Sequence, residues 1–286
     1  MDQKYITLFD RYTHGGMSRR EFLDKLSILA GSTAAASALL PVLENNYAYA
    51  ETVPENSPDL VIQNGEIAPG VSGQLAIPKN ATGKLPAVLV IHENRGLNPH
   101  IKDVTRRMAL EGFVAFGADY LAPMGGTPED PEVAREMIGK LNAPDVVAYS
   151  MKSIAALKAH QQSTGKAGAM GFCWGGGQVN ALAVADPGLA AGVAYYGSQP
   201  KAEDVPKITA PLMLHYASLD ERINAGIADY EAALKAAGKT YEIHMYEGAN
   251  HAFNNDTNEA RYNKEAADLA WGRTVAFLKQ HAGGTS

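Results

Sequence analysis

The most reactive side chain in this sequence is its single cysteine, which lies in the stretch Gly171-Phe172-Cys173-Trp174-Gly175. The pattern Gly-x-Cys-x-Gly follows a short apolar run and suits a sharp strand-to-helix turn, which needs residues without bulk on either side of its apex. The side chain at the apex stands beside a helix N-terminus, where free N–H groups and the helix dipole favour an anion. A thiol in this place ionises more readily, and the thiolate is the nucleophile. The other interpretation is a buried cysteine that packs as a small hydrophobic residue.

A thiol nucleophile also needs a base to hold its proton and an acid to orient that base. Asp220 and His251 each come shortly after an apolar or alternating run that predicts a strand. Their order along the chain, Cys173 then Asp220 then His251, is that of α/β-hydrolases. Taken singly, Asp220 also suits a helix N-cap and His251 a loop histidine. The joint order favours a Cys-Asp-His set that performs acyl transfer.

Acyl transfer further requires donors that stabilise an oxyanion. The backbone N–H of the residue after the nucleophile, Trp174, is the first candidate. The second should come from the loop His92-Glu93-Asn94-Arg95-Gly96, and we assign it to the backbone N–H of Asn94. We expect Trp174 and Asn94 to contact the substrate through these groups.

The elements that must position these residues are short apolar runs that alternate with helical patterns. The central runs are continuously apolar, as in a parallel sheet covered on both faces. The predicted strands are 60–62, 73–77, 87–91, 114–118, 166–171, 192–196, 212–216 and 241–246. The predicted helices are 100–111, 132–160, 175–185, 224–237 and 258–281. This pattern predicts one α/β domain with a doubly wound, mostly parallel sheet of about eight strands flanked by helices. Ligands of such sheets bind at the carboxyl ends of the strands, where all the candidate residues fall.

The first 50 residues differ from the rest of the chain. The stretch 18–23 (SRREFL) precedes an uncharged run over 26–43, and Ala48-Tyr49-Ala50 gives the small-x-small pattern of a cleavage site. The paired arginines followed by Phe-Leu resemble a twin-arginine export signal. We therefore predict a signal peptide over 1–50 and the catalytic domain over 51–286.

Export implies the twin-arginine machinery as a partner, a periplasmic or secreted mature protein, and no stable membrane span after cleavage. Two alternatives stay open for this segment. It could be an amphipathic N-terminal helix that packs on the domain, or a tether that remains in the membrane.

Composition excludes several other classes of function. Of the 286 residues, 46% are hydrophobic and 20% are charged, and the net charge is −6, so nothing indicates nucleic-acid binding. One cysteine permits no internal disulfide, and the eight histidines show no metal-ligand spacing. We predict no metal and no cofactor, because side chains and water complete the chemistry.

Together these motifs resemble the dienelactone hydrolase family over residues 73–281. The resemblance rests on the following residues: His92-Glu93-x-x-Gly96, Gly171-Phe172-Cys173-Trp174-Gly175-Gly176, Asp220 and Gly248-x-x-His251-x-Phe253. It implies an α/β-hydrolase fold and carboxymethylenebutenolidase-like hydrolysis of a lactone or carboxylic ester through an acyl-enzyme. In this resemblance Cys173 attacks the substrate, His251 transfers protons and Asp220 orients His251.

The resemblance also implies a role for Glu93, which matches a family glutamate that contacts the resting thiol. A charged Glu93 in a partly dry pocket would have a raised pKa. The alternative is that Glu93 forms an ion pair with Arg95 or Arg222. The family holds a substrate carboxylate with arginines, one of them shortly after the catalytic histidine. Residues 251–256 (HAFNND) contain no arginine, so an anionic lactone is not implied.

Two functions from other classes remain as alternatives. The first is an exported ligand-binding protein that keeps a hydrolase fold without catalysis, since fold does not establish function. The second is thiol redox chemistry at Cys173, which a chain without a second cysteine disfavours.

Overall fold

The computed structural model describes residues 1–47 and 51–283 of the chain. The predicted cleavage site, Ala48-Tyr49-Ala50, lies outside the described residues.

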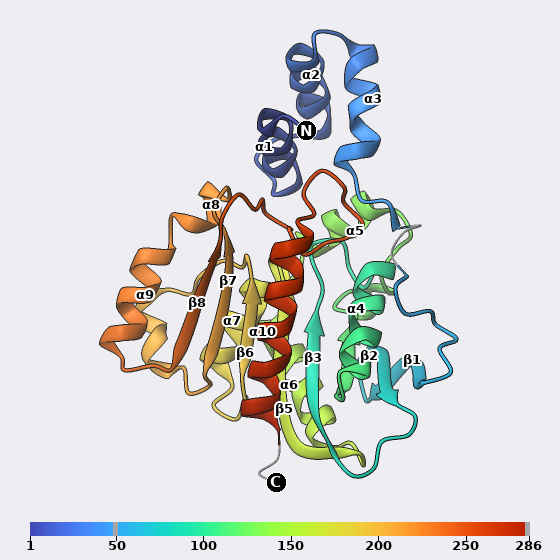
Figure 1. Cartoon of the computed structure of the whole chain (residues 1–286), viewed down its shortest axis with the longest axis vertical. Helices are drawn as coiled ribbons and strands as arrows, with labels where there is room; N and C mark the ends of the chain where they lie inside the picture. Colours follow the sequence, from blue (N-terminus) through green and yellow to red (C-terminus); the bar gives the residue numbers. More distant parts are fainter. Residues whose placement is uncertain (48–50, 284–286) are drawn as a thin grey trace.

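One eight-stranded sheet forms the centre of the molecule, in the order β1-β2-β4-β3-β5-β6-β7-β8 (Figure 1). The strands are β1 Leu60–Ala68, β2 Val71–Pro78, β3 Leu85–Ile91, β4 Val114–Ala118, β5 Ser163–Phe172, β6 Gly192–Tyr195, β7 Leu212–Ala217 and β8 Tyr241–Tyr246. The pairs β1–β2 and β2–β4 are antiparallel, and every other neighbouring pair is parallel. The carboxyl ends of six strands, from β4 to β8 along the sheet, therefore meet at one edge.

Both faces of the sheet are buried, which explains why the central strands are apolar throughout. In β3, Val88 and Val90 join the cluster under α4 and α10, whereas Leu89 and Ile91 join the cluster under α6, α7 and α9. These helices are α4 Pro99–Leu110, α6 Ala143–Ala159, α7 Trp174–Ala185, α9 Ile227–Ala236 and α10 Lys264–Ala282. Successive side chains of a strand point to opposite faces, so one strand supplies both cores. The predicted fold class is confirmed.

Two predicted helices were wrong. The predicted helix 258–281 begins only at Lys264, as α10, because Asn263 caps its N-terminus. The pattern over 132–160 predicts a single helix, but the chain forms α5 Pro131–Ile138 and then α6 from Ala143. Asn142 is the N-cap of α6, and Pro144 occupies its first turn. Proline suits that position because the first N–H groups of a helix have no partner within it, whereas inside a longer helix it would remove a hydrogen bond.

The N-terminal residues form three helices, α1 Gln3–Thr13, α2 Arg19–Ala30 and α3 Thr33–Leu43. They lie beyond the carboxyl edge of the sheet and share a small core of their own (Figure 1). The stretch 18–23, which resembles an export motif, also forms the N-terminus of α2. The Ser18 hydroxyl accepts a hydrogen bond from the Glu21 N–H at 3.2 Å and so caps α2. In this structure the N-terminal helices pack on the catalytic domain, as in the alternative of an amphipathic N-terminal helix considered from the sequence.

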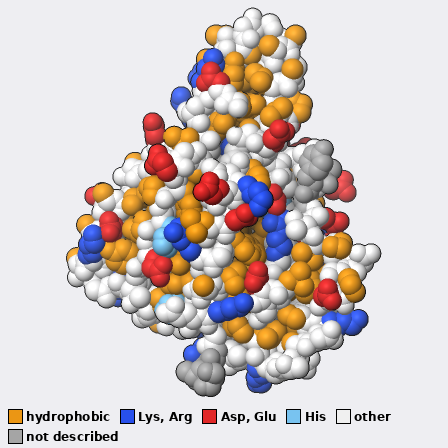
Figure 2. All heavy atoms as spheres, in the orientation of Figure 1, with side chains coloured by type: hydrophobic (Ala, Val, Ile, Leu, Met, Phe, Trp, Pro, Cys, Tyr) orange, Lys and Arg blue, Asp and Glu red, His pale blue; other side chains and the backbone are white. Residues whose placement is uncertain are grey.

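Much of the apolar surface of α2 and α3 faces solvent (Figure 2). Ile28 is 79% exposed and Leu29 is 40% exposed, and in α3 only Ala36 and Leu43 are buried. No single helix among the described residues is long and apolar enough to cross a membrane; α2 and α3 reach that length and composition only together, as a pair bent by 113°. Exposed apolar surface of this kind is unusual for a packed subdomain.

Candidate active site

Cys173 stands at the turn between β5 and α7. Its backbone has φ 55°, a left-handed conformation that costs energy for a non-glycine residue. The neighbouring glycines fit the sequence argument closely. A Cβ on Gly171 would lie 2.4 Å from the carbonyl oxygen of Gly175, and a Cβ on Gly175 would lie 2.4 Å from the carbonyl oxygen of Ile91. Backbone packing at the end of β3 therefore requires glycine on both sides of the thiol.

Asp220 and His251 reach the same edge from the ends of β7 and β8. The Nδ1 atom of His251 lies 2.5 Å from Oδ2 of Asp220, and both residues are buried. Oδ1 of Asp220 also accepts the N–H of Ile223 at 3.3 Å, so the residue caps the helix α8 Glu221–Asn224 as well. Burial alone would raise the pKa of Asp220, but the neighbouring His251 outweighs it, and the pKa lies below its ordinary value. Asp220 is an anion that orients the imidazole.

The other nitrogen of His251 faces the thiol. A ring nitrogen of His251 and Sγ of Cys173 lie within 4.8 Å of each other. Since Nδ1 is taken by Asp220, we assign Nε2 to the thiol side. Nε2 is buried and has no hydrogen-bond partner among the described residues. An unpartnered buried lone pair beside a thiol is suited to accept its proton.

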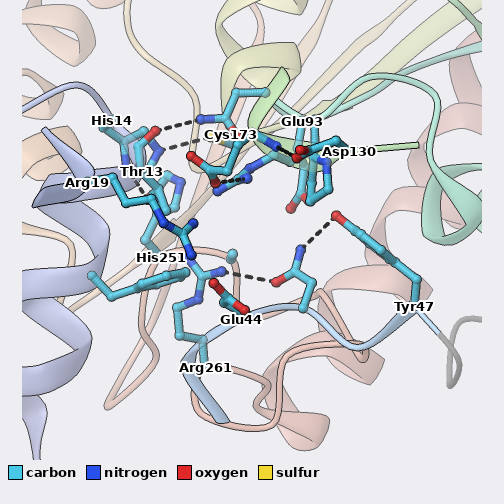
Figure 3. Close-up of a pocket in the computed structure, with 17 residues that line it drawn as sticks. Thr13, His14, Arg19, Glu44, Tyr47, Glu93, Asp130, Cys173, His251 and Arg261 are labelled. Carbon is cyan, nitrogen blue, oxygen red and sulfur yellow. Dashed lines mark hydrogen bonds and ion pairs between the residues drawn. The ribbon is translucent and has the colours of Figure 1, made fainter. Parts of the chain in front are cut away.

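A third residue, His14, enters this site from the N-terminal helices (Figure 3). It follows α1, and its Nε2 atom lies 3.1 Å from Sγ of Cys173. Its ring meets the ring of His251 edge-on, with centroids 4.6 Å apart. The sequence did not point to His14 as a site residue, because it falls within the predicted signal peptide over 1–50. The i, i+4 pair Asp10 and His14 on one helix face was the available signal.

The contacts of His14 fix its orientation and charge. Nδ1 of His14 bonds the backbone carbonyl of Asp10 at 2.8 Å and lies 3.2 Å from its carboxylate. Burial would lower the pKa of His14, but the charges of Cys173 and Asp10 outweigh it, and the pKa is raised above its ordinary value. Burial likewise opposes the ionisation of Asp10, yet His251 and His14 hold the pKa of Asp10 well below its usual range.

Glu93 lies at the site and is 5% exposed. Oε2 of Glu93 accepts a hydrogen bond from the Asn255 side chain at 2.9 Å. Neither ion pair considered from the sequence appears among the described residues: Arg95 pairs with Glu132, and Arg222 lies 3.7 Å from a carboxylate oxygen of Asp10. The role of Glu93 toward the thiol stays a prediction.

The two residues proposed for the oxyanion hole, Trp174 and Asn94, line one cavity together with Cys173. Trp174 begins α7, so its backbone N–H is in the first turn of that helix and has no partner within it. Its indole stacks on the His92 ring with centroids 5.3 Å apart. The Asn94 side chain donates to the backbone carbonyl of Thr13 at 2.9 Å and so ties the N-terminal segment to the loop after β3. The oxyanion roles of both residues stay predictions.

Two cavities meet at the thiol, with volumes of 470 and 500 Å³. Cys173, His251 and His14 line both, so His14 stands between them. Three arginines line the first cavity, namely Arg19, Arg95 and Arg261. The sequence motifs pointed to Arg95 and Arg222 but not to Arg19 or Arg261.

Comparison with known proteins agrees with this geometry. A family model described as "Dienelactone hydrolase family" matches residues 71–282, and a second, described as "YqhI-like", matches residues 1–31. A "Putative carboxymethylenebutenolidase" of Saccharolobus solfataricus is 34% identical over 242 residues, covering 72% of this chain and 92% of that protein.

Solved structures give the same result for the fold. A putative dienelactone hydrolase of Klebsiella pneumoniae superposes with a TM-score of 0.70 at 30% identity, covering 77% of this chain and 99% of that chain. A thermostable esterase of Pseudomonas putida superposes with a TM-score of 0.64 at 16% identity, and the match covers 99% of this chain and 98% of that chain. That likeness of fold extends over the N-terminal helices. Since the first family model spans most of the sequence, this chain belongs to the dienelactone hydrolase family of hydrolases.

Proposed function

We propose that this protein hydrolyses a carboxylic ester or lactone through a covalent thioester on Cys173. The observation that carries the proposal is the arrangement of three groups at one sheet edge. The thiol stands at a helix N-terminus, a ring nitrogen of His251 lies within 4.8 Å of it, and Asp220 contacts Nδ1 of that ring at 2.5 Å. This proximity supports a nucleophile, a base and an orienting acid for acyl transfer.

The reaction would proceed in two halves. The Cys173 sulfur attacks the carbonyl carbon, and the backbone N–H groups of Trp174 and Asn94 stabilise the negative oxygen of the tetrahedral intermediate. His251, which has taken the thiol proton, returns it to the departing alkoxide oxygen. His251 then takes a proton from water, whose oxygen attacks the thioester. The carbon–sulfur bond breaks, the acid is released, and His251 returns the proton to the Cys173 sulfur. Asp220 keeps the imidazole in the required orientation and stabilises its protonated form.

We infer that an arginine of the first cavity binds a negatively charged group of a small substrate, although the carboxylates Glu44, Glu93, Asp130 and Glu132 line the same cavity. Of the three arginines that line the first cavity, Arg95 already pairs with Glu132. Arg19 and Arg261 have no carboxylate within ion-pair distance in the described part of the chain. We infer that Arg261, which belongs to the catalytic domain, is the better candidate to contact a substrate carboxylate. Names of relatives such as carboxymethylenebutenolidase are consistent with a lactone of this kind.

We also propose that residues 1–50 are a twin-arginine export signal and that the mature enzyme works in the periplasm or outside the cell. The exposed apolar surface of α2 and α3 supports this, since a signal must present such surface to the export machinery. In the full chain the same segment covers the nucleophile, which is only 8% exposed. Removal of the segment would open the site.

The esterase likeness favours a second role for this segment, as a permanent cap over the active site. The two roles predict opposite results for a chain that begins at Glu51. A signal that covers the site predicts higher activity after removal, whereas a cap that shapes the substrate pocket predicts lower activity.

The test compares the full chain and residues 51–286, each with its Cys173→Ala variant, on p-nitrophenyl acetate and a panel of lactones. We expect turnover that disappears with Cys173→Ala, and a thioester mass adduct after rapid acid quenching. Full activity in Cys173→Ala would refute the mechanism. Stoichiometric ligand binding by a folded protein without turnover would favour the non-catalytic binding protein instead.

A further inference from the structure

The active site holds three metal-ligand atoms that point at one another. They are Nε2 of His14, Sγ of Cys173 and a ring nitrogen of His251, and all lie within 4.8 Å of one another. The closest pair is His14 and Cys173, whose atoms are 3.1 Å apart. Ligands of a tetrahedral zinc ion, with bonds of about 2.0–2.3 Å, stand roughly 3.3–3.8 Å apart. Small movements of side chains would bring all three atoms to that spacing.

The second nitrogen of each imidazole is held by an aspartate. Nδ1 of His251 lies 2.5 Å from the Asp220 carboxylate, and Nδ1 of His14 bonds the backbone carbonyl of Asp10 at 2.8 Å, with the Asp10 carboxylate 3.2 Å away. A carboxylate or a backbone carbonyl on the second nitrogen is the usual outer support of a metal-ligating histidine, because it fixes the tautomer that presents Nε2 to the metal. A positive group also lies nearby, since the Arg222 guanidinium is 3.5 Å from Nδ1 of His251. The two negative charges of Asp10 and Asp220 outweigh this one positive charge.

The unpartnered atom of the cluster points to a missing ligand. Nε2 of His251 is buried and bonds nothing among the described residues, although a buried nitrogen of this kind is normally satisfied. The His251 residue is 4% exposed. One thiolate and two imidazoles form a set of sulfur and nitrogen donors. Such a set binds zinc more strongly than it binds magnesium or calcium, which favour oxygen donors.

We propose that the full chain binds one zinc ion through His14, Cys173 and His251, with a fourth coordination position open to the cavities on either side. Zinc binds the thiolate of Cys173 and the neutral imidazoles of His14 and His251. The proton of the Cys173 thiol, and the proton on Nε2 of His14 that its raised pKa favours, therefore pass to solvent when the bonds to zinc form. A zinc-bound thiolate is not free to attack a carbonyl, so the occupied site is inactive. This consequence for activity rests on the proposed function, whereas the binding itself does not.

The site would exist only while the N-terminal segment stays in place. His14 supplies one of three ligands, so a chain from which residues 1–50 have been removed would bind zinc weakly and keep its thiolate free. The spacing of histidines along the chain predicts no metal site. Our proposal departs from that prediction because the ligands come from three distant parts of the sequence.

The experiment titrates metal into the metal-free, reduced full chain without substrate. Zinc is followed by competition with a chromophoric chelator, and Co²⁺ is used as a spectroscopic probe. We expect one ion per chain, with tetrahedral d–d bands and a thiolate-to-cobalt charge-transfer band. Cys173→Ser should abolish the charge-transfer band, and His14→Ala should weaken zinc binding by at least about 100-fold.

His160→Ala is the matched control, since His160 caps the C-terminus of α6 at the opposite edge of the sheet. It should bind zinc as the wild type does. Equal zinc affinity in His14→Ala and wild type, or cobalt binding without a thiolate band, would overturn the proposal. Circular dichroism of His14→Ala checks that the fold is intact, and if that variant misfolds, the cobalt spectrum of the wild type decides.

The two proposals fail separately. A chain that binds zinc as described but shows no ester or lactone hydrolysis when metal-free would refute only the proposed function. A metal-free chain that hydrolyses esters equally well with and without equimolar zinc would refute only the zinc site.

Discussion

Gly175→Ala tests whether backbone packing at the turn positions the nucleophile. The added Cβ would lie 2.4 Å from the carbonyl oxygen of Ile91 and 2.5 Å from that of His92. Overpacking of a core costs about 1–3 kcal/mol. Here the opposing atoms are backbone at the end of β3 and cannot rotate away, so we expect a loss of about 3 kcal/mol in the free energy of unfolding.

Urea denaturation measures this loss. With a slope of about 3 kcal/mol per molar urea, the midpoint would fall by about 1 M. The remaining folded protein should also lose on the order of 100-fold in kcat/KM. The added methyl group fits only if the turn shifts, and a shift of roughly 1 Å would move the thiol away from its reactive position.

Gly272→Ala is the matched control for this change. Gly272 lies within α10, and an added Cβ there meets no atom within 4 Å. Alanine is favoured over glycine inside a helix by up to about 1 kcal/mol, so this variant should be slightly more stable than the wild type and fully active. If Gly175→Ala showed the midpoint and kcat/KM of Gly272→Ala, the packing argument for the turn would be refuted.

Two further predictions concern buried titratable groups. Asp220→Asn should lower kcat by roughly 10²- to 10⁴-fold at neutral pH, because an amide no longer selects the productive tautomer of His251; unchanged steady-state kinetics would contradict this. His215 is fully buried, and burial holds its pKa well below the ordinary value. The unfolded chain therefore takes up a proton below pH ~6.5 that the folded chain does not, and stability should fall by up to about 1.4 kcal/mol per pH unit as pH decreases. Urea midpoints between pH 7 and 5 should show a smaller slope in His215→Gln, with His281→Gln as control; equal slopes in all three proteins would be evidence against the assignment.

The zinc site and the export signal both depend on the N-terminal helices. In the full chain they contribute His14 to the thiol and Arg19 to the cavity. A cell that folds the protein before export would therefore carry a covered enzyme until the segment is removed. This sequence of events follows from the two proposals together.

Much of the fold could be predicted from local patterns. The central strands β3 and β4 are continuous apolar runs, and burial on both faces requires such runs in a parallel sheet. In β1 the apolar run covers only residues 60–62, and the exposed remainder of the strand gave no signal. The turn at Cys173 could be predicted because only glycine tolerates the backbone contacts beside it. Asp220 and His251 could be placed at one edge because parallel strands end there. These inferences need only the periodicity of the chain and the steric demands of single residues.

The tertiary structure alone decided how residues far apart in the chain meet. His14 belongs to a segment whose composition resembles a leader, and no local pattern indicates that it lies 3.1 Å from Cys173. Arg261 falls within the predicted helix 258–281, but α10 begins only at Lys264, so Arg261 lies in the preceding loop and lines the cavity. The break between α5 and α6 depends on competition between a helical pattern and one proline, which packing resolves. Contacts between distant residues depend on how whole elements pack, and that packing is a property of the complete chain and not of any short stretch of it.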